Sequence, residues 1–227
     1  MFRKTIIALL AGVSMMSLTG AELKVQNNKI MFGNSAMHLW PTGMVSFTNA
    51  KGLMGTMYPH FTTSGKEKWY SIGNKASGSK LVSHEDKTWL YEANIPLAEG
   101  GMAVKENIAV SPFNAVDVAV SWTIPANAKD LVEAAYFIHL PVKNFADVPI
   151  IVNGRKLTVV NETKYGWFSA TLENPVFELY SGVSGSEFSL AFAGKFNISI
   201  GTAKDGMITI RVISISGTEI KLAATPK

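Results

Sequence analysis

Aromatic and polar side chains that could hold a ligand gather in residues 49–79. This stretch contains five glycines and little alternation, which predicts a long irregular connection, and such connections in compact domains often carry function. Aromatic rings beside polar groups suit a sugar, because its apolar C–H face stacks on a ring while its hydroxyls need hydrogen-bond partners. Lys66, Glu67, Lys68 and Asn74 could supply those partners. The candidate ligand-binding residues of this stretch are Tyr58, His60, Trp69 and Tyr70.

Each of these residues also has a purely structural interpretation. Large aromatic side chains are most often packing residues, so Trp69 and Tyr70 could instead anchor a long loop onto the core. Trp89 and Tyr91 form a second candidate pair, because residues two apart on a strand share a face and could make a flat binding platform. The same spacing also fits two side chains on the core face of the strand.

Motifs for catalysis, metals and cofactors are absent from the sequence. The four histidines, at positions 38, 60, 84 and 139, show no metal-ligand spacing. His84–Asp86 combines a base with two acids, as many solvated turns do. No nucleophile elbow, phosphate loop, dinucleotide fingerprint or calcium loop occurs, and the carboxylate pair of a glycosidase cannot be chosen from sequence. We therefore predict no catalytic residue, no metal site and no cofactor.

The N-terminus predicts export. A basic head, Met1–Lys4, precedes an uncharged and mostly apolar run, Thr5–Leu18, and small residues follow up to Ala21. This order is typical of a secretory signal peptide, here residues 1–21, with cleavage before Glu22. A membrane anchor is the alternative, but a bilayer span needs about 20 apolar residues, and this run is shorter. We expect a bacterial protein, periplasmic or extracellular, with no transmembrane segment in its mature chain.

The net charge and the absence of cysteine limit the binding partners and the covalent cross-links that we expect. Removing Arg3 and Lys4 with the signal peptide lowers the formal charge from +4 to +2. No basic run exceeds two residues, so nucleic acid is not an expected partner. The absence of cysteine excludes disulfides and a lipid anchor, so the core alone must stabilise the fold. The mature chain, 22–227, has a length that suits one large domain.

Alternation of apolar and polar residues with period 2 dominates the mature chain. Residues 116–124 show it most clearly, and Asn153-Gly154 and Asp205-Gly206 are typical of tight hairpin turns. Residues 127–135 are the one helix candidate, with a wide turn as the alternative. The expected strands are 23–26, 29–32, 36–40, 43–48, 79–83, 87–93, 102–110, 115–124, 134–140, 149–152, 155–160, 164–171, 175–181, 187–193, 195–200, 207–215 and 218–222.

So many short strands must close into a sandwich or a barrel. An outer-membrane barrel would have longer strands, and several segments here are apolar on both faces, which suits the centre of a sandwich. Two domains with a seam near residues 141–149 are a further alternative, but no Gly/Ser/Pro-rich linker occurs there. We predict an all-β fold, a mostly antiparallel two-sheet β-sandwich forming a single domain over residues 22–227.

The middle of the chain resembles the β-sandwich ("supersandwich") modules of secreted bacterial polysaccharide-processing proteins. The resemblance is one of strand rhythm and covers roughly residues 85–160, in Trp89–Glu92, Val116–Ile124, Tyr136–Pro141 and Ile150–Gly154. It implies a carbohydrate-associated role and transfers no catalytic residue.

Three classes of function follow, in decreasing order of support. The first is a non-catalytic carbohydrate-binding or accessory protein that holds a glycan by the aromatic-rich segment. The second is a structural or adhesion protein of the cell envelope that acts through protein–protein contacts, for example at an open sheet edge. The third is a glycan hydrolase or lyase.

Overall fold

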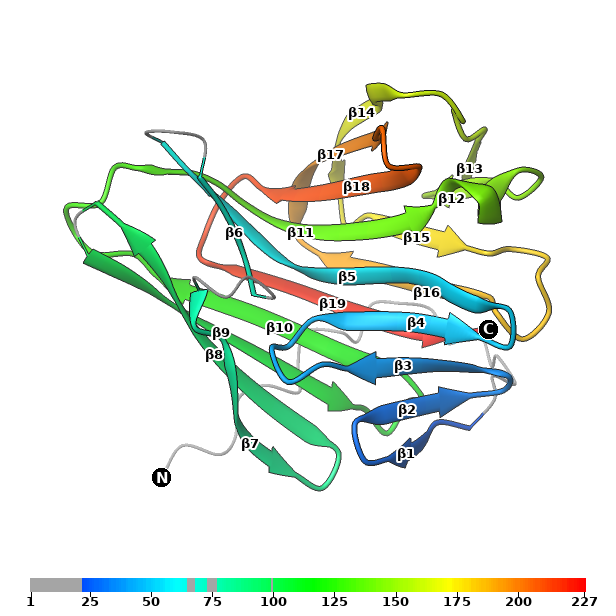
Figure 1. The fold of residues 1–227 in the computed structure, drawn as a ribbon, viewed down its shortest axis with the longest axis horizontal. Coiled ribbons are helices and arrows are strands. Elements are labelled where there is room, and N and C mark those ends of the chain that lie inside the picture. Colours follow the sequence, from blue (N-terminus) through cyan, green and yellow to red (C-terminus); the bar gives the residue numbers. More distant parts are fainter. Residues whose placement is uncertain (1–21, 65–67, 73–76, 99) are drawn as a thin grey trace.

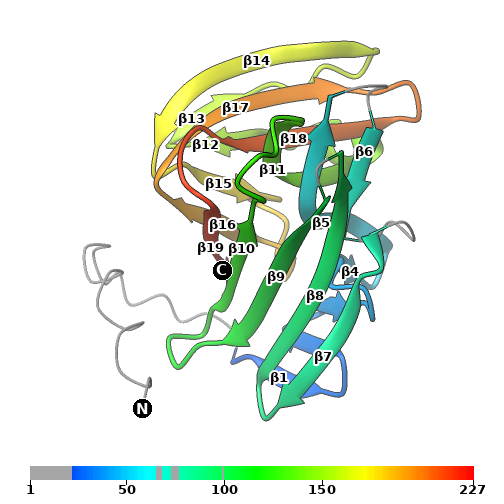
Figure 2. The same ribbon diagram turned by 90° about the vertical axis from the view of Figure 1, so that its left-hand side faces the viewer.

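The computed structural model describes residues 22–64, 68–72, 77–98 and 100–227, and these form two antiparallel sheets packed face to face (Figure 1, Figure 2). The predicted all-β, two-sheet sandwich in a single domain is confirmed. The expected signal peptide, residues 1–21, lies outside the described residues, as do Lys66, Glu67 and Asn74.

The larger sheet, sheet A, has ten strands in the order β1-β2-β3-β4-β5-β11-β18-β17-β14, and β6 pairs with β5 beside this path. Its strands are β1 Lys24–Gln26, β2 Lys29–Phe32, β3 Ser35–Leu39, β4 Val45–Asn49, β5 Gly52–Thr63, β6 Lys68–Ser71, β11 Leu131–Pro141, β14 Lys164–Glu173, β17 Lys195–Thr202 and β18 Met207–Ser214.

The second sheet, sheet B, has nine strands in the order β13-β12-β15-β16-β19-β10-β9-β8-β7. Its strands are β7 Lys80–Glu85, β8 Thr88–Leu97, β9 Gly100–Val110, β10 Val116–Thr123, β12 Ile150–Val152, β13 Arg155–Leu157, β15 Val176–Leu179, β16 Phe188–Ala193 and β19 Glu219–Pro226. A short 3₁₀ helix, η2 Val142–Phe145, follows β11.

The core lies between the inner faces of the two sheets. Because neighbouring side chains of a strand point to opposite faces, each alternating strand sends its apolar series into this layer. Phe47 of sheet A stacks on Phe188 of sheet B with ring centroids 4.5 Å apart, and Phe61 of sheet A meets Trp122 of sheet B edge-on at 5.7 Å. Contacts of this kind account for the stability of a domain without disulfides.

One local prediction is wrong, because residues 49–79 contain a 12-residue strand, β5, where an irregular connection was predicted. The segment becomes a strand because β5 is hydrogen-bonded to β4 along one edge and to β11 along the other. Gly55, which weakened the strand pattern, permits this approach, since an added Cβ would lie 2.7 Å from the carbonyl oxygen of His139. Of the two alternatives for residues 127–135, the helix is excluded: the chain makes a turn at residues 126–127, and β11 begins at Leu131.

Candidate binding site on the outer face of sheet A

Four aromatic side chains from two central strands form a cluster on the outer face of sheet A. The alternation of β5 points Phe61 into the core and Tyr58 and His60 outward, and β11 adds Phe137 and His139 beside them. The His60 ring stacks on Phe137 at 4.0 Å, and the Tyr58 ring stacks on His139 at 5.4 Å. Tyr58 Oη and His139 Nε2 are 2.9 Å apart, a hydrogen bond that fixes both rings. Tyr58, His60, Phe137 and His139 are called the aromatic cluster below.

Charged side chains border the aromatic cluster. Arg211 of β18 lies opposite Phe137 in the sheet register, with its guanidinium carbon 5.7 Å from the ring centroid. The same guanidinium forms an ion pair with Glu133 at the start of β11. Arg211 Nε and Glu133 Oε1 are buried and have no hydrogen-bond partner within the described part of the chain.

The imidazoles and the phenol of the cluster are held in their uncharged forms. Burial lowers the pKa of His60 to about 4, helped by the positive charge of Arg211 and by His139. Burial also lowers the pKa of His139, an effect partly offset by Asp205, and raises the pKa of Tyr58. A neutral imidazole both donates and accepts a hydrogen bond, as a sugar hydroxyl does.

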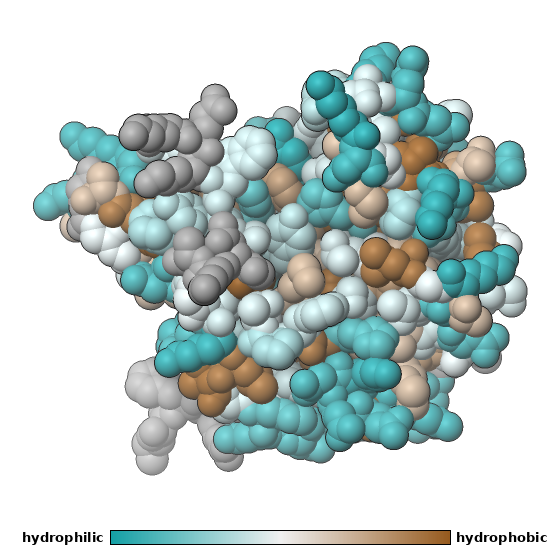
Figure 3. All heavy atoms as spheres, in the orientation of Figure 1, coloured by the Kyte–Doolittle hydropathy of each residue, from teal (hydrophilic) through white to brown (hydrophobic). Residues whose placement is uncertain are grey.

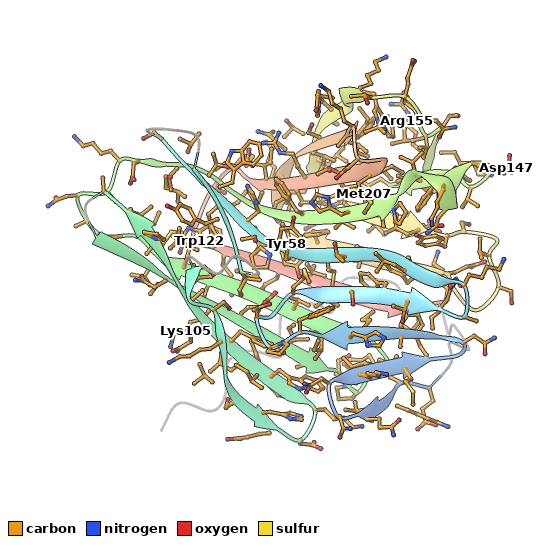
Figure 4. All side chains as sticks on the ribbon, viewed as in Figure 1. Tyr58, Lys105, Trp122, Asp147, Arg155 and Met207 are labelled. Atoms are coloured by element: carbon orange, nitrogen blue, oxygen red, sulfur yellow. The ribbon has the colours of Figure 1, made fainter. Side chains whose placement is uncertain are left out.

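Two exposed tryptophans lie on the same outer face as the cluster. Trp69 of β6 is 63% exposed, and its ring lies edge-on to His60 with centroids 6.3 Å apart. Trp40, in the turn after β3, is 49% exposed and its indole N–H donates to Ser46 Oγ at 3.1 Å. Figure 4 shows Tyr58 near the middle of the face that these residues share.

Sequence reasoning missed Trp40 as a candidate. The signal was present: Trp40 ends an alternating run and begins the turn sequence Trp-Pro-Thr-Gly, where a large aromatic residue has little core to reach. Its backbone N–H bonds to the carbonyl oxygen of Met44, so the tryptophan belongs to a tight connection between β3 and β4.

The other predicted site residues lie in the core, and the predicted platform of Trp89 and Tyr91 is wrong. Trp89 is 0% and Tyr91 1% exposed, because β8 belongs to sheet B and turns this side toward sheet A. Tyr70 of β6 is also buried, since it is paired with the inward-facing Phe61. Of the six predicted residues, the structure brings together Tyr58, His60 and Trp69 on one outer face, and it places Tyr70, Trp89 and Tyr91 inside.

A buried carboxyl group was also missed. Glu106 occupies an inward position of β9 and is 0% exposed. Its neighbours on the same face of the strand are the apolar residues Met102, Val104 and Ile108. The hydroxyl of Tyr136 donates to Glu106 Oε1 at 3.4 Å, while Oε2 has no hydrogen-bond partner among the described residues. Burial raises the pKa of this carboxyl well above its ordinary value. Its position between the sheets separates it from any ligand on the outer face.

Neither a metal centre nor a membrane-spanning helix is found in the described ranges. No group of three or more His, Asp or Glu side chains there could hold a metal ion. No helical segment among these residues has the length and hydropathy that a bilayer crossing needs.

Comparison with known proteins gives a likeness of fold alone. No protein-family model and no curated protein matches the sequence. The fold is similar to a 4-alpha-glucanotransferase from Thermococcus litoralis, with a TM-score of 0.45 and 8% identity over 89% of this chain and 36% of that one. It is also similar to a proposed aldose 1-epimerase from Escherichia coli K12, with a TM-score of 0.48 and 9% identity over 86% of this chain and 96% of that one.

The chain thus spans about a third of the length of the glucanotransferase. Both neighbours are named for an activity on a glucan or an aldose, and neither likeness carries that activity to this chain. The likeness concerns the arrangement of strands, and it assigns neither a residue nor an activity to this protein.

Proposed function

We propose that this protein is an exported, non-catalytic carbohydrate-binding protein whose glycan lies on the outer face of sheet A. The observation that carries the proposal is the position of Trp69, 63% exposed and edge-on to a stacked aromatic cluster. Exposing so much of an indole to water is unfavourable, and exposed aromatic groups with a polar surround commonly mark binding surfaces.

The polar groups around the tryptophans match the needs of a sugar. The apolar side of a pyranose ring can stack on Trp69 or Trp40, while its hydroxyls exchange hydrogen bonds with the part-exposed hydroxyls of Tyr58 and Thr209, which are held in place by His139. Rings fixed by stacking lose little conformational entropy on binding, so the site is prepared for its ligand.

The ion pair between Glu133 and Arg211 on this face supports binding without catalysis. A glycan hydrolase uses two carboxyl groups set at a defined separation across the sugar. Glu133, the carboxylate beside the cluster, is held in an ion pair with Arg211. The ion pair commits one oxygen of this carboxylate.

An envelope protein that binds other proteins is the second candidate. It is favoured by β14, a ten-residue strand at the edge of sheet A that pairs only with β17 within the described part of the chain. Tyr165 on this strand is 74% exposed. Open edges of this kind accept an extended strand from a partner.

The first test of glycan binding is Trp69→Ala, which we expect to raise the Kd at least about tenfold, because truncation of an aromatic anchor commonly costs more than about 1 kcal/mol. The melting temperature should stay within about 2 °C of the wild type, since the side chain is largely exposed. A glycan array would identify the ligand, and calorimetry would then measure the Kd.

Two matched variants make this test decisive. Phe113→Ala removes an aromatic ring that is 81% exposed at the β9–β10 turn of sheet B, and it should leave the Kd unchanged. Tyr70→Ala removes a buried ring, so binding and melting temperature should fall together. Absence of glycan binding by a folded sample, or wild-type affinity in Trp69→Ala, would contradict the proposal and favour the β14 edge.

A further inference from the structure

A row of polar residues crosses sheet A through the candidate site. Residues paired across neighbouring strands point to the same face, so successive pairings trace a line at right angles to the strands. One such line starts at β1, crosses β2, β3, β4, β5, β11 and β18, and ends at β17. It consists of Gln26, Lys29, His38, Ser46, Thr56, His139, Thr209 and Gly201.

No apolar side chain interrupts this polar row, and the row passes both aromatic features of the site. Ser46 accepts the indole N–H of Trp40, and His139 belongs to the aromatic cluster. Five strand spacings of about 4.8 Å separate Lys29 from Thr209, which gives a length of about 24 Å. One spacing is close to the length of a pyranose unit in an extended glycan, so the row matches a chain of about five sugars.

The β1–β4 end of the face carries positive charge. A second row of paired residues lies beside the polar row there, formed by Lys24, Met31, Ala36 and Thr48. The two rows together contain two lysines and no carboxylate on these four strands. Neither lysine takes part in an ion pair within the described ranges, whose four pairs lie elsewhere. Figure 3 shows hydrophilic side chains gathered over β2 and β3.

A groove lies at the same end. It has a volume of about 360 Å³ and is lined by residues of both rows, among them Lys29, His38 and Thr48. Among its lining residues, His38 Nε2 and Thr48 Oγ1 are 2.9 Å apart. Burial and the nearby Lys29 ammonium lower the pKa of His38, so the lysine provides the positive charge at neutral pH.

We propose that the ligand is an anionic oligosaccharide that lies along the polar row, with a carboxylated sugar in the groove beside Lys29. This inference rests on the proposed function and adds the direction, the length and the charge of the glycan. Hydroxyls along the chain meet the polar row, Trp40 lies beside the row at Ser46, and Lys29 binds one carboxylate in a charge-assisted contact. Trp69, paired with Thr62 farther along β5, lies to one side of the row next to His60.

The test is calorimetric titration with galacturonate oligomers and with neutral cello-oligosaccharides as the disaccharide, tetrasaccharide and hexasaccharide. We expect the Kd to fall at least about tenfold from the galacturonate disaccharide to the hexasaccharide, as successive units add contacts. Lys29→Gln should raise the Kd of the galacturonate hexasaccharide about fivefold, the effect of one partly exposed ion pair, and reduce its dependence on salt.

Lys156→Gln is the matched control, because Lys156 is an exposed lysine on β13 of sheet B, and it should behave as the wild type. Equal Kd values for the acidic and neutral hexasaccharides, or no effect of Lys29→Gln, would overturn the anionic subsite and leave the proposed function standing. A Kd independent of length would overturn the path along the polar row. If no glycan binds, both the inference and the proposed function fail.

Discussion

Replacing Gly43 by alanine is expected to lower the free energy of unfolding by about 2–4 kcal/mol. Gly43 lies in the β3–β4 turn with φ at +89°, a backbone conformation that residues other than glycine rarely adopt. An added Cβ would also lie 2.5 Å from Glu106 Oε2 and 3.1 Å from Tyr91 Cγ, both in the core. The strain of the backbone costs about 1 kcal/mol and overpacking of the core about 1–3 kcal/mol more.

Gly217→Ala separates these two contributions. Gly217 has a similar φ of +78°, but an added Cβ would meet no atom within 4 Å, so only the backbone cost of about 1 kcal/mol remains. Urea unfolding of the two variants and the wild type would measure the difference. Equal losses in the two variants would show that the contact of Gly43 with the core has no energetic weight.

The strands were predictable wherever one face of a strand meets the core and the other meets water. Residues 116–124 alternate cleanly because β10 packs its Val and Trp side chains between the sheets and exposes the opposite face. β5 could not be predicted in the same way. Gly55 and Pro59 disturb its alternation, and it becomes a strand because β4 and β11 pair with both of its edges.

The candidate site was predictable only in part, because local pattern does not say which face of a strand is the inner one. Trp89 and Tyr91 show the same spacing that a surface platform would have, yet the position of β8 in sheet B buries them. Tyr58 and His139, 81 residues apart in sequence, meet only through the pairing of β5 with β11. Trp69 lies in the aromatic-rich stretch 49–79 and was predicted as a site residue, whereas Trp40 lies outside that stretch and was not.

Glu106 predicts an unusual dependence of stability on pH. This carboxyl lies between Tyr91 and Val120 in the register of sheet B and faces Tyr136 across the core. Burial raises its pKa well above the ordinary value of 4.5, so the folded protein keeps the proton to a higher pH than the unfolded chain does. Folding therefore takes up one proton at Glu106 at pH values between the two pKa values.

The sign of the effect follows from linkage. Because the folded state binds the additional proton, the free energy of unfolding falls as pH rises, by about 1.4 kcal/mol per pH unit for one proton. The contribution is fully present below pH 4.5 and is lost progressively until the pH reaches the raised pKa of the folded state. Glu106→Gln keeps the shape of the side chain and removes the proton, so this variant should lack the decline and become more stable than the wild type at alkaline pH.

Urea unfolding of the wild type and Glu106→Gln across a series of pH values would test this expectation. Other carboxyl groups act equally in both proteins, so the difference between the two curves isolates Glu106. Glu219→Gln is the control, since it removes a carboxylate from a partly exposed ion pair with Lys221, worth about 0–1 kcal/mol. Parallel curves for the wild type and Glu106→Gln would mean that Glu106 is ionised in the core. In that case Oε2 must have a partner, such as a bound water, since a bare carboxylate between two apolar sheet faces would cost several kcal/mol.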